Sequence, residues 1–225
     1  TIQNLSEKYE GLNIYVRKDP KSLPLSILDG IKSANSKYIM WLDADGSMDG
    51  ASVKKLLEKF TLSKESVVIG SRFTEGGGYK GVKSISNSSF YQSILNIRKS
   101  KDSVLGMIVS ILFNKVLYYI FNSGIRDITS GFIVLEKEYI NEEVFKKADY
   151  GEYFIFLVED LLNKNKNIIE VGYICKTRDH GVSKTASSIF QLLIRGIPYI
   201  RATISSRIKK WKQLEINKTK SLLFF

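Results

Sequence analysis

The most constraining feature of the sequence is an apolar run, Tyr38 to Leu42, that ends abruptly in Asp43-Ala44-Asp45-Gly46-Ser47. The run has no polar side, which is typical of a strand buried on both faces, as in a parallel sheet covered by helices. Open α/β sheets bind their ligands at the carboxyl ends of such strands. The stretch therefore predicts an α/β fold with a polar site directly after this strand.

The two acids that follow the run have a spacing suited to metal binding. Residues i and i+2 of an extended chain point the same way, so the carboxylates of Asp43 and Asp45 can converge. These oxygen ligands, with Ser47 close behind, suit Mg2+ or Mn2+ holding a diphosphate. The alternative is a polar turn that caps a helix beginning near Asp49. An EF-hand calcium loop is excluded, because neither reading frame of that motif places a glutamate at its last position.

Strand and helix patterns alternate along the chain, whose 225 residues suffice for one domain with a substantial core. This alternation predicts a mostly parallel sheet with flanking helices and right-handed connections. Apolar periodicity predicts helices over residues 2–9, 25–35, 51–60, 104–121 and 153–162, and strands over residues 12–16, 38–42, 66–69, 133–135 and 168–175.

The net charge and the low content of histidine and cysteine limit which partners and which kinds of site we expect. The net charge of +11 favours polyanionic partners: phosphorylated small molecules, anionic lipid or nucleic acid. No nucleic-acid-binding motif is present, and we expect no nucleic-acid partner. The lone His180 cannot build a histidine-rich site, so any metal is expected to be held by oxygen. The lone Cys175 excludes an internal disulfide.

Two segments are candidates for contact with a membrane. Residues 104–121 are strongly apolar but contain Asn114 and Lys115, which argues for a helix packed on the domain or lying at a membrane surface rather than crossing it. Residues 185–225 interleave apolar side chains with arginine, lysine and Trp211, which predicts basic amphipathic helices at an anionic membrane interface. The alternative for this tail is a helix docked on its own domain.

Several short motifs follow one another between Thr1 and about Lys184. They are Asp43-Ala44-Asp45-Gly46-Ser47, Gly70-Ser71-Arg72, Gly76-Gly77-Gly78, Ser110 with Asn114, Asp127 to Phe132, Gly151 to Phe154, Glu170-Val171, and Arg178 with Gly181, Ser183 and Lys184. In this order and spacing they resemble glycosyltransferase family 2, and within it the polyprenol-phosphate glycosyltransferases of the dolichol-phosphate mannose type. The resemblance implies a GT-A (Rossmann-like) fold, a nucleotide-sugar donor, a divalent metal, inversion at the anomeric carbon and a lipid-phosphate acceptor.

The sequence also departs from this family. The family's first two strands end in Pro-x-Tyr-Asn-Glu and in Asp-Asp-x-Ser-x-Asp-Gly-Thr, and these motifs do not occur here. We therefore expect residues 1–184 to form an N-terminally truncated GT-A-like domain that lacks much of the base- and ribose-binding pocket. Ile133 replaces an arginine that often follows the Gly-Phe pair, and Gly172 replaces a proline. These departures leave the identity of the donor open.

The acids have roles that depend on the acceptor. A metal bridging Asp43, Asp45 and the donor diphosphate would act as the Lewis acid for the leaving group, and Ser47 could add a ligand. A lipid phosphate is already ionised and needs no general base, so positioning and charge stabilisation would do most of the work. Asp127 either holds its turn or faces the reacting phosphate, and it is the first candidate base if the acceptor is a hydroxyl.

Cations are needed to hold the phosphates, and Arg72, Arg178 and Lys184 are the candidates. Arginine offers a bidentate fork to phosphate, whereas lysine offers a mobile point charge. By family resemblance, Ser183 and Gly77 join this phosphate-binding set. Asp45, Asp127 and Arg72 are the predicted catalytic residues.

These features predict a metal-dependent hexosyltransferase that moves mannose or glucose from a GDP- or UDP-hexose to polyprenyl phosphate, at the cytoplasmic face of a membrane. One alternative is a family 2 enzyme that acts on a glycan hydroxyl. The other is a non-catalytic, membrane-associated scaffold, because the base-binding strands are missing.

Overall fold

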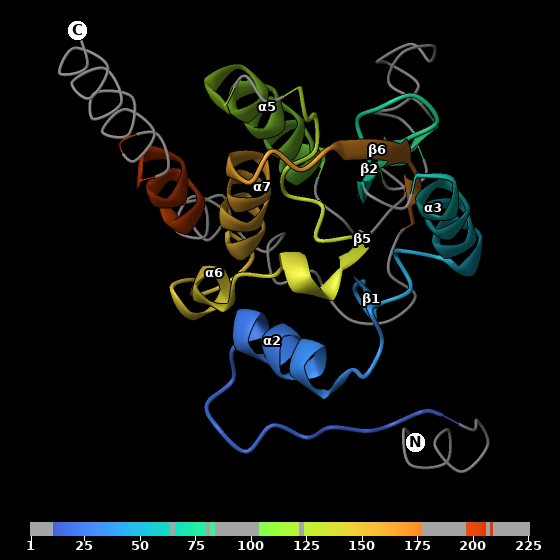
Figure 1. Ribbon diagram of the computed structural model, residues 1–225. Coiled ribbons are helices and arrows are strands. Elements are labelled where there is room, and N and C mark those ends of the chain that lie inside the picture. Colours follow the sequence, from blue (N-terminus) through green and yellow to red (C-terminus); the bar gives the residue numbers. More distant parts are fainter. Residues whose placement is uncertain are drawn as a thin grey trace, which may run out of the picture.

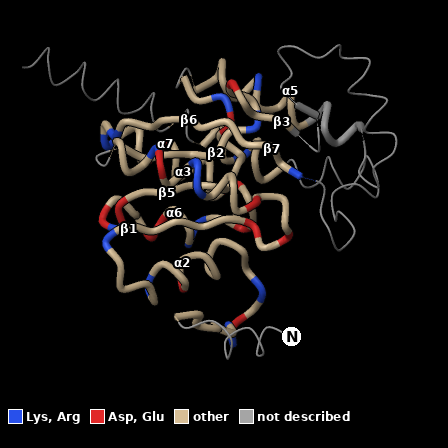
Figure 2. Tube along the Cα trace, turned by 90° about the vertical axis from the view of Figure 1, so that its right-hand side faces the viewer, with Lys and Arg blue, Asp and Glu red and all other residues tan. Residues whose placement is uncertain are grey.

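A four-stranded sheet forms the centre of the computed structural model, which describes residues 11–63, 66–79, 82–83, 104–121, 124–176, 197–205 and 208. The sheet has the order β1-β5-β2-β6, with β1 (Tyr38–Trp41), β5 (Ile133–Glu136), β2 (Val67–Ser71) and β6 (Ile168–Gly172) (Figure 2). β2 pairs in parallel with β6, and β5 is antiparallel to both β1 and β2. Three of the four strands thus run in the same direction, and the predicted α/β fold is confirmed.

The reversed direction of β5 was not predicted, and it shapes the edge of the sheet. β5 is entered from the turn at residues 127–132, with Trp41 and Ile69 both opposite Ile133. Because β5 runs opposite to its neighbours, the turn that precedes it lies at the edge where β1, β2 and β6 end. The residues that follow β1, β2 and β6 and the residues that precede β5 therefore lie at the same edge of the sheet.

Helices cover both faces of the sheet (Figure 1). The helix α3 (Gly50–Leu62) packs on one face, where its Leu56 and Phe60 meet Val68 of β2. On the other face, α2 (Leu23–Ser33), α6 (Glu142–Lys146) and α7 (Tyr153–Asn163) enclose the larger core. Successive strand residues point to opposite faces, so Val67 and Ile69 enter this larger core while Val68 does not.

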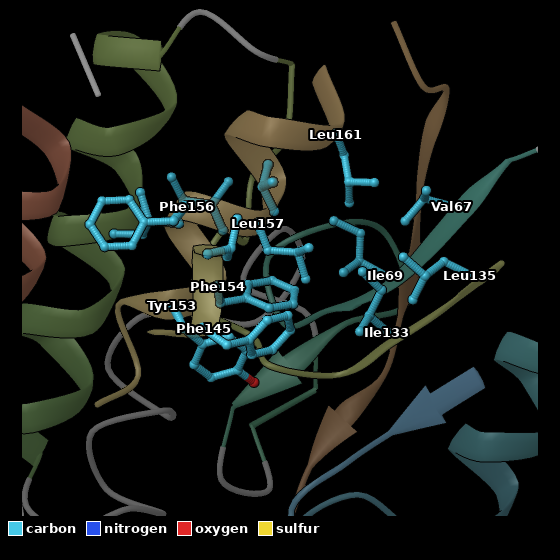
Figure 3. Packing of buried hydrophobic residues seen from close by; sticks show 14 of the residues in the cluster. Val67, Ile69, Ile133, Leu135, Phe145, Tyr153, Phe154, Phe156, Leu157 and Leu161 are labelled. Carbon is cyan, nitrogen blue, oxygen red and sulfur yellow. The ribbon is translucent and has the colours of Figure 1, made fainter. Parts of the chain in front are cut away.

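The larger core is dense in aromatic side chains from α7 and its neighbours (Figure 3). Phe145 stacks on Tyr153 with their ring centroids 5.5 Å apart, and Tyr153 meets Phe154 edge to face at 6.1 Å. Every residue from Tyr153 to Val158 is buried, so packing against the core supplies most of the stability of this helix. The core therefore holds α7 against the sheet beside the carboxyl end of β1.

Side chains cap the two helices that flank β1. Ser22 accepts a hydrogen bond from the backbone N–H of Leu25 at 3.4 Å, and Pro24 occupies the first turn of α2. Asp49 accepts one from the backbone N–H of Ser52 at 2.8 Å and begins α3. The predicted helix start near Asp49 is confirmed, and the capping acid is Asp49 itself rather than Asp43 or Asp45.

A second, smaller sheet contains β4 (Val82–Lys83), β3 (Gly78–Tyr79) and β7 (Ile174–Cys175) in that order. A single strand was predicted over residues 168–175, and this prediction is wrong, because the chain leaves the first sheet after Gly172 and pairs with β3 from Ile174. A side chain at Gly172 would collide with the backbone of residues 75–77. The glycine thus lets the loop after β2 cross the end of β6 at close range.

Two further helices lie beside the larger core. The helix α5 (Val104–Phe121) has the bounds predicted from its apolar run, and residues 197–205 are also helical. The rings of Phe113 and Tyr199 meet edge to face with centroids 6.0 Å apart, so the two helices are neighbours. Across the helices that the structure describes, no segment combines the length and apolar character needed to cross a membrane.

Two predictions near the amino end need correction. Residues 12–16 form no strand, and their apolar side chains stay exposed, with Val16 at 76%. The strand β1 is only partly buried, because it is an edge strand of the described sheet. Tyr38 and Leu42, which follows the strand, stay accessible. The helix predicted over residues 2–9, and most of the tail at residues 185–225, lie outside the described residues.

Candidate active site

The acid-rich loop, residues 43–47, directly follows β1. It lies at the edge of the sheet where β1, β2 and β6 end. Asp43 is exposed and Asp45 is half-buried, and one Asp45 oxygen accepts the backbone N–H of Ser47 at 3.0 Å. Gly46 has φ = 79°, a left-handed conformation that glycine adopts without strain. The backbone N–H of Asp43 points to the Met48 sulfur at 3.4 Å. The loop thus holds two carboxylates on a tight turn that is closed by hydrogen bonds from its backbone N–H groups to the side chains of Asp45 and Met48.

Arg72 and Asp127 form a buried ion pair at the end of β2. The Arg72 backbone N–H and Nε both donate to Asp127 Oδ2, at 2.9 and 2.8 Å, and Arg72 Nη2 donates to Oδ1 at 2.8 Å. The Asp127 side chain is fully buried and that of Arg72 is 12% exposed. Both carboxylate oxygens are therefore engaged by the same arginine, in the bidentate geometry that makes such pairs strong.

Thr129 and Asn114 extend this ion pair toward α5, and neither residue was predicted to belong to the site. Arg72 Nη2 also donates to Thr129 Oγ1 at 2.9 Å. Asn114 is buried, and its Nδ2 lies 2.9 Å from the same Thr129 oxygen and 3.0 Å from the Ser110 carbonyl. The signal for Asn114 was a polar residue inside an apolar helix. Such a residue persists in a core when it has hydrogen-bond partners.

Glu170 holds the start of the turn at residues 127–132 in place. It was also not predicted as a site residue. It lies on β6 and accepts the backbone N–H groups of Arg126 at 2.9 Å and Asp127 at 3.0 Å. Burial raises the pKa of the Glu170 carboxyl, while these two backbone hydrogen bonds act in the opposite direction. Glu170 thereby fixes the backbone of the residue that pairs with Arg72.

The glycine loop after Arg72 is shaped by packing. A Cβ at Gly77 would lie 2.7 Å from the Ser71 carbonyl oxygen and 2.8 Å from Arg72 backbone atoms, closer than real side chains approach. Lys55 of α3 donates to the Gly172 carbonyl at 2.7 Å and covers this crossing. These contacts explain why glycine stands at 77, and the phosphate-binding role of Gly77 stays a prediction.

The other predicted phosphate-binding residues follow a segment that is tied to the acid-rich loop. The backbone N–H of Lys176 donates to the Ser47 carbonyl at 2.9 Å, and Lys176 Nζ lies 2.9 Å from Asp49 Oδ2. Arg178, Ser183 and Lys184 follow shortly after Lys176 in the sequence, but they lie outside the described residues. The chain thus enters this segment beside the acids.

An aromatic pair borders the acid-rich loop on the side of α7. The Trp41 Nε1 group donates to the Tyr153 hydroxyl at 3.0 Å, and Trp41 is the last residue of β1. Burial raises the pKa of Tyr153, and the charge of Asp43 raises it further, which places this hydroxyl in the field of the loop. The strand end that carries the acids is therefore fastened to α7.

The acid-rich loop offers few protein donors to a metal ion. Within the described residues, no group of three or more His, Cys, Asp and Glu side chains is placed to hold an ion. The protein donors at the loop are two carboxylates, Asp43 and Asp45, with the buried Ser47 behind them. Mg2+ typically takes one or two carboxylates and completes its shell with water and substrate phosphates. This donor set therefore fits a metal that arrives with a diphosphate.

At the edge of the sheet, the structure gathers the predicted residues in two groups. Asp43, Asp45 and Ser47 form the acid-rich loop at the end of β1, while Arg72 and Asp127 form the ion pair at the end of β2.

Two comparisons relate the chain to known proteins. The family model described as "Glycosyl transferase family 2" matches residues 1–142, a range that includes both groups. An uncharacterized protein of Methanocaldococcus jannaschii is 26% identical over 199 residues, which cover 84% of this chain and 76% of that protein.

Proposed function

The chain belongs to glycosyl transferase family 2, and from this premise we propose that it moves a hexose, mannose or glucose, from a GDP- or UDP-sugar to polyprenyl phosphate. Membership of this family implies the transfer of a glycosyl group from a nucleotide sugar to an acceptor. The donor, the hexose and the lipid, with inversion at the anomeric carbon, are the parts that we add.

The acid-rich loop supports the donor half of the proposal. A divalent Mg2+ or Mn2+ bound there would neutralise the departing diphosphate as a Lewis acid. Asp43 and Asp45 would hold that ion, with Ser47 as a further ligand. The hydrogen bond from the Ser47 backbone to Asp45 fixes the turn before any ligand binds, so little reorganisation is needed during the reaction.

One observation carries the choice of acceptor: Asp127 is fully buried and both its oxygens are bound by Arg72. A general base must come within hydrogen-bond reach of the proton that it removes. Asp127 in this state serves to position Arg72, which disfavours it as the base for a hydroxyl acceptor. A phosphate acceptor needs no base, and its oxygen attacks the anomeric carbon directly.

The acceptor phosphate would be held by Arg178, Lys184 and Ser183, together with the loop around Gly77. The anchoring of Lys176 to Ser47 and Asp49 supports this assignment, because it starts the segment that carries these residues beside the acid-rich loop. Arg72 would contribute its charge from the ion pair, at the boundary between donor and acceptor.

We also propose that the domain works at the cytoplasmic face of a membrane, where a polyprenyl lipid resides. On α5, Leu112, Val116 and Tyr119 are exposed, and the neighbouring helix exposes Ile197, Ile200 and Ile204. Each set follows helical spacing and so lies on one face of its helix. Lys115 and Arg201 are also exposed on these helices, and the chain carries +11. Apolar side chains with basic residues around them fit an anionic lipid surface.

The test is a transfer assay on the full chain with labelled GDP-mannose and UDP-glucose, offered polyprenyl phosphate in vesicles or a soluble oligosaccharide. We expect product on the lipid only, dependent on Mn2+ or Mg2+ and abolished by EDTA. Asp45→Ala should reduce turnover about a hundredfold or more, because the leaving group loses its charge stabilisation. Asp29→Ala, which removes an acid on α2 that pairs with Arg17 away from the site, is the matched control and should retain activity.

Three results would overturn the proposal. Product on the oligosaccharide would identify a transferase that acts on a glycan hydroxyl. Full activity of Asp45→Ala would remove the role given to the acid-rich loop. Failure to bind UDP or GDP in the presence of Mn2+ would support a non-catalytic scaffold.

A further inference from the structure

The helix at residues 197–205 has two different faces. Ile197, Ile200 and Ile204 are exposed, whereas Ala202 is 1% exposed and Thr203 is 5% exposed. Tyr199 packs against the larger core from this second face, and Thr203 donates to its backbone carbonyl at 2.8 Å. The helix therefore inserts one aromatic side chain into the domain while the isoleucines point away.

Tyr199 is seated over Gly151, at the start of α7. Its hydroxyl occupies the space that a Cβ at residue 151 would need, and its ring meets Phe113 of α5 edge to face. The next residue, Glu152, is buried and accepts the backbone N–H groups of Asp149 at 2.6 Å and Tyr150 at 3.1 Å. The hydroxyl thus lies on a turn whose backbone is already fixed, and only glycine leaves room for it.

Charged groups of the candidate active site act on this hydroxyl. Burial raises the pKa of Tyr199, and the charges of Glu152 and Asp43 raise it further, while that of Arg72 lowers it. Tyr199 therefore stays protonated at neutral pH and can donate a hydrogen bond. Within the described part of the chain, the hydroxyl itself makes no hydrogen bond.

The geometry points to Tyr199 as a substrate-contacting residue: we propose that its hydroxyl donates a hydrogen bond to a hydroxyl of the sugar being transferred. This inference rests on the proposed function and extends it by making the C-terminal helix part of the donor site. A sugar hydroxyl is the favoured ligand because it can accept from a phenol beside carboxylates. In the proposed function the donor phosphates are held by the ion at Asp43 and Asp45, so the sugar is the part of the donor that remains for Tyr199 to contact.

The test compares ligands that differ only in the sugar. Binding of UDP-glucose and UDP, and of GDP-mannose and GDP, is measured with Mn2+ for the wild type, Tyr199→Phe and Gly151→Ala. Loss of one hydrogen bond should weaken nucleotide-sugar binding about fivefold in Tyr199→Phe and leave the nucleotide diphosphates within about twofold. Gly151→Ala should do the same by displacing the hydroxyl. Tyr139→Phe, a buried tyrosine in the 3-10 helix Lys137–Tyr139, is the control and should change neither.

The outcomes separate this inference from the proposed function. Equal weakening of the nucleotide sugar and the nucleotide in Tyr199→Phe would show a structural role only and overturn the inference. Unchanged binding in both Tyr199→Phe and Gly151→Ala would also overturn it, while transfer that still depends on Asp45 keeps the proposed function. If the wild type binds no nucleotide sugar, the proposed function fails and the inference fails with it.

Discussion

At the scale of single residues, the ion pair of Arg72 and Asp127 is the most deeply buried interaction of the candidate site. A carboxylate that is fully buried and bound through both oxygens is an anchor for its partner, so the two residues act as one unit. Buried pairs of this kind are costly to break, because removal of one partner leaves a charge without compensation.

The unit can be tested by a double-mutant cycle with Asp127→Asn, Arg72→Gln and the double variant. Each single change should lower the free energy of unfolding by about 3 kcal/mol, and the double variant should lose clearly less than the sum. Urea unfolding followed by circular dichroism measures all three. The less buried pair of Arg17 and Asp29, whose side chains are 16% and 28% exposed, provides the comparison and should show a smaller coupling. If the losses of unfolding free energy in the two single variants simply add in the double variant, Arg72 and Asp127 do not act as one unit.

Asp49 gives a prediction with a defined pH dependence. Hydrogen bonds from Ser52, and then the contact with Lys176, lower the pKa of the Asp49 carboxyl from 3.8 to about 2. A depressed pKa in the folded state stabilises the fold above 3.8, and this stabilisation is lost as the pH falls toward about 2. Asp49→Ala should therefore cost about 1 kcal/mol at neutral pH, measured by urea unfolding, and the deficit should shrink at acid pH.

Asparagine separates the two contributions of Asp49. Asp49→Asn keeps a good helix cap but loses the ion pair with Lys176, so it should cost less than Asp49→Ala at neutral pH. A deficit of Asp49→Ala that is independent of pH would show that the charge of Asp49 contributes nothing to stability.

The sequence indicates the residues of the candidate site more directly than it indicates their partners. Asp43, Asp45 and Ser47 could be found because their spacing along one strand end is local. The contact between Arg72 and Asp127 spans 55 residues and forms only because β5 is reversed, which no local pattern indicates. Glu170 was recognised as part of a motif, but its hydrogen bonds to the backbone of Arg126 and Asp127 depend on the pairing of β6 with β2.

At the scale of elements, prediction succeeded where one segment carries its own signal. The bounds of α5 follow from an uninterrupted apolar run, and α3 from a cap and a regular stripe. Residues 12–16 alternate as a strand should, yet no described strand pairs with them, and strands need partners to form. The break between β6 and β7 depends on the loop that crosses at Gly172, which is a contact between distant elements.

The crossing at Gly172 leads to a prediction about elements. Gly172→Ala would place a Cβ 2.5 Å from the Gly77 nitrogen, so the loop after β2 or the end of β6 must shift. We expect a loss of about 2 kcal/mol in unfolding free energy, measured by urea titration. Gly30→Ala on the exposed side of α2 is the matched control, because a Cβ there meets nothing within 4 Å. That variant should instead gain about 0.5–1 kcal/mol from helix propensity. Equal effects of the two substitutions would rule out the crossing.

At the scale of the whole molecule, the candidate site and the exposed apolar helix faces meet through α5. Asn114 of this helix reaches Thr129 beside the ion pair, while Leu112, Val116 and Tyr119 are exposed on it. The helix α5 thus contacts the candidate site on one side and exposes apolar side chains on another. An enzyme that takes its acceptor from a bilayer benefits from this layout, because docking brings the lipid head toward the site.

The apolar faces predict how the protein binds vesicles. The double variant Ile200→Ser/Ile204→Ser removes two half-exposed isoleucines from the face that we propose for membrane contact, and it should weaken binding to phosphatidylcholine–phosphatidylserine vesicles about tenfold or more. Sedimentation with vesicles measures this, and added salt should weaken binding further because the basic residues are screened. Leu62→Ser, at the end of α3 and 83% exposed, removes an apolar side chain elsewhere and should bind as the wild type does. If both variants bind equally well, these isoleucines do not face the lipid, and the acceptor must reach the site by another surface.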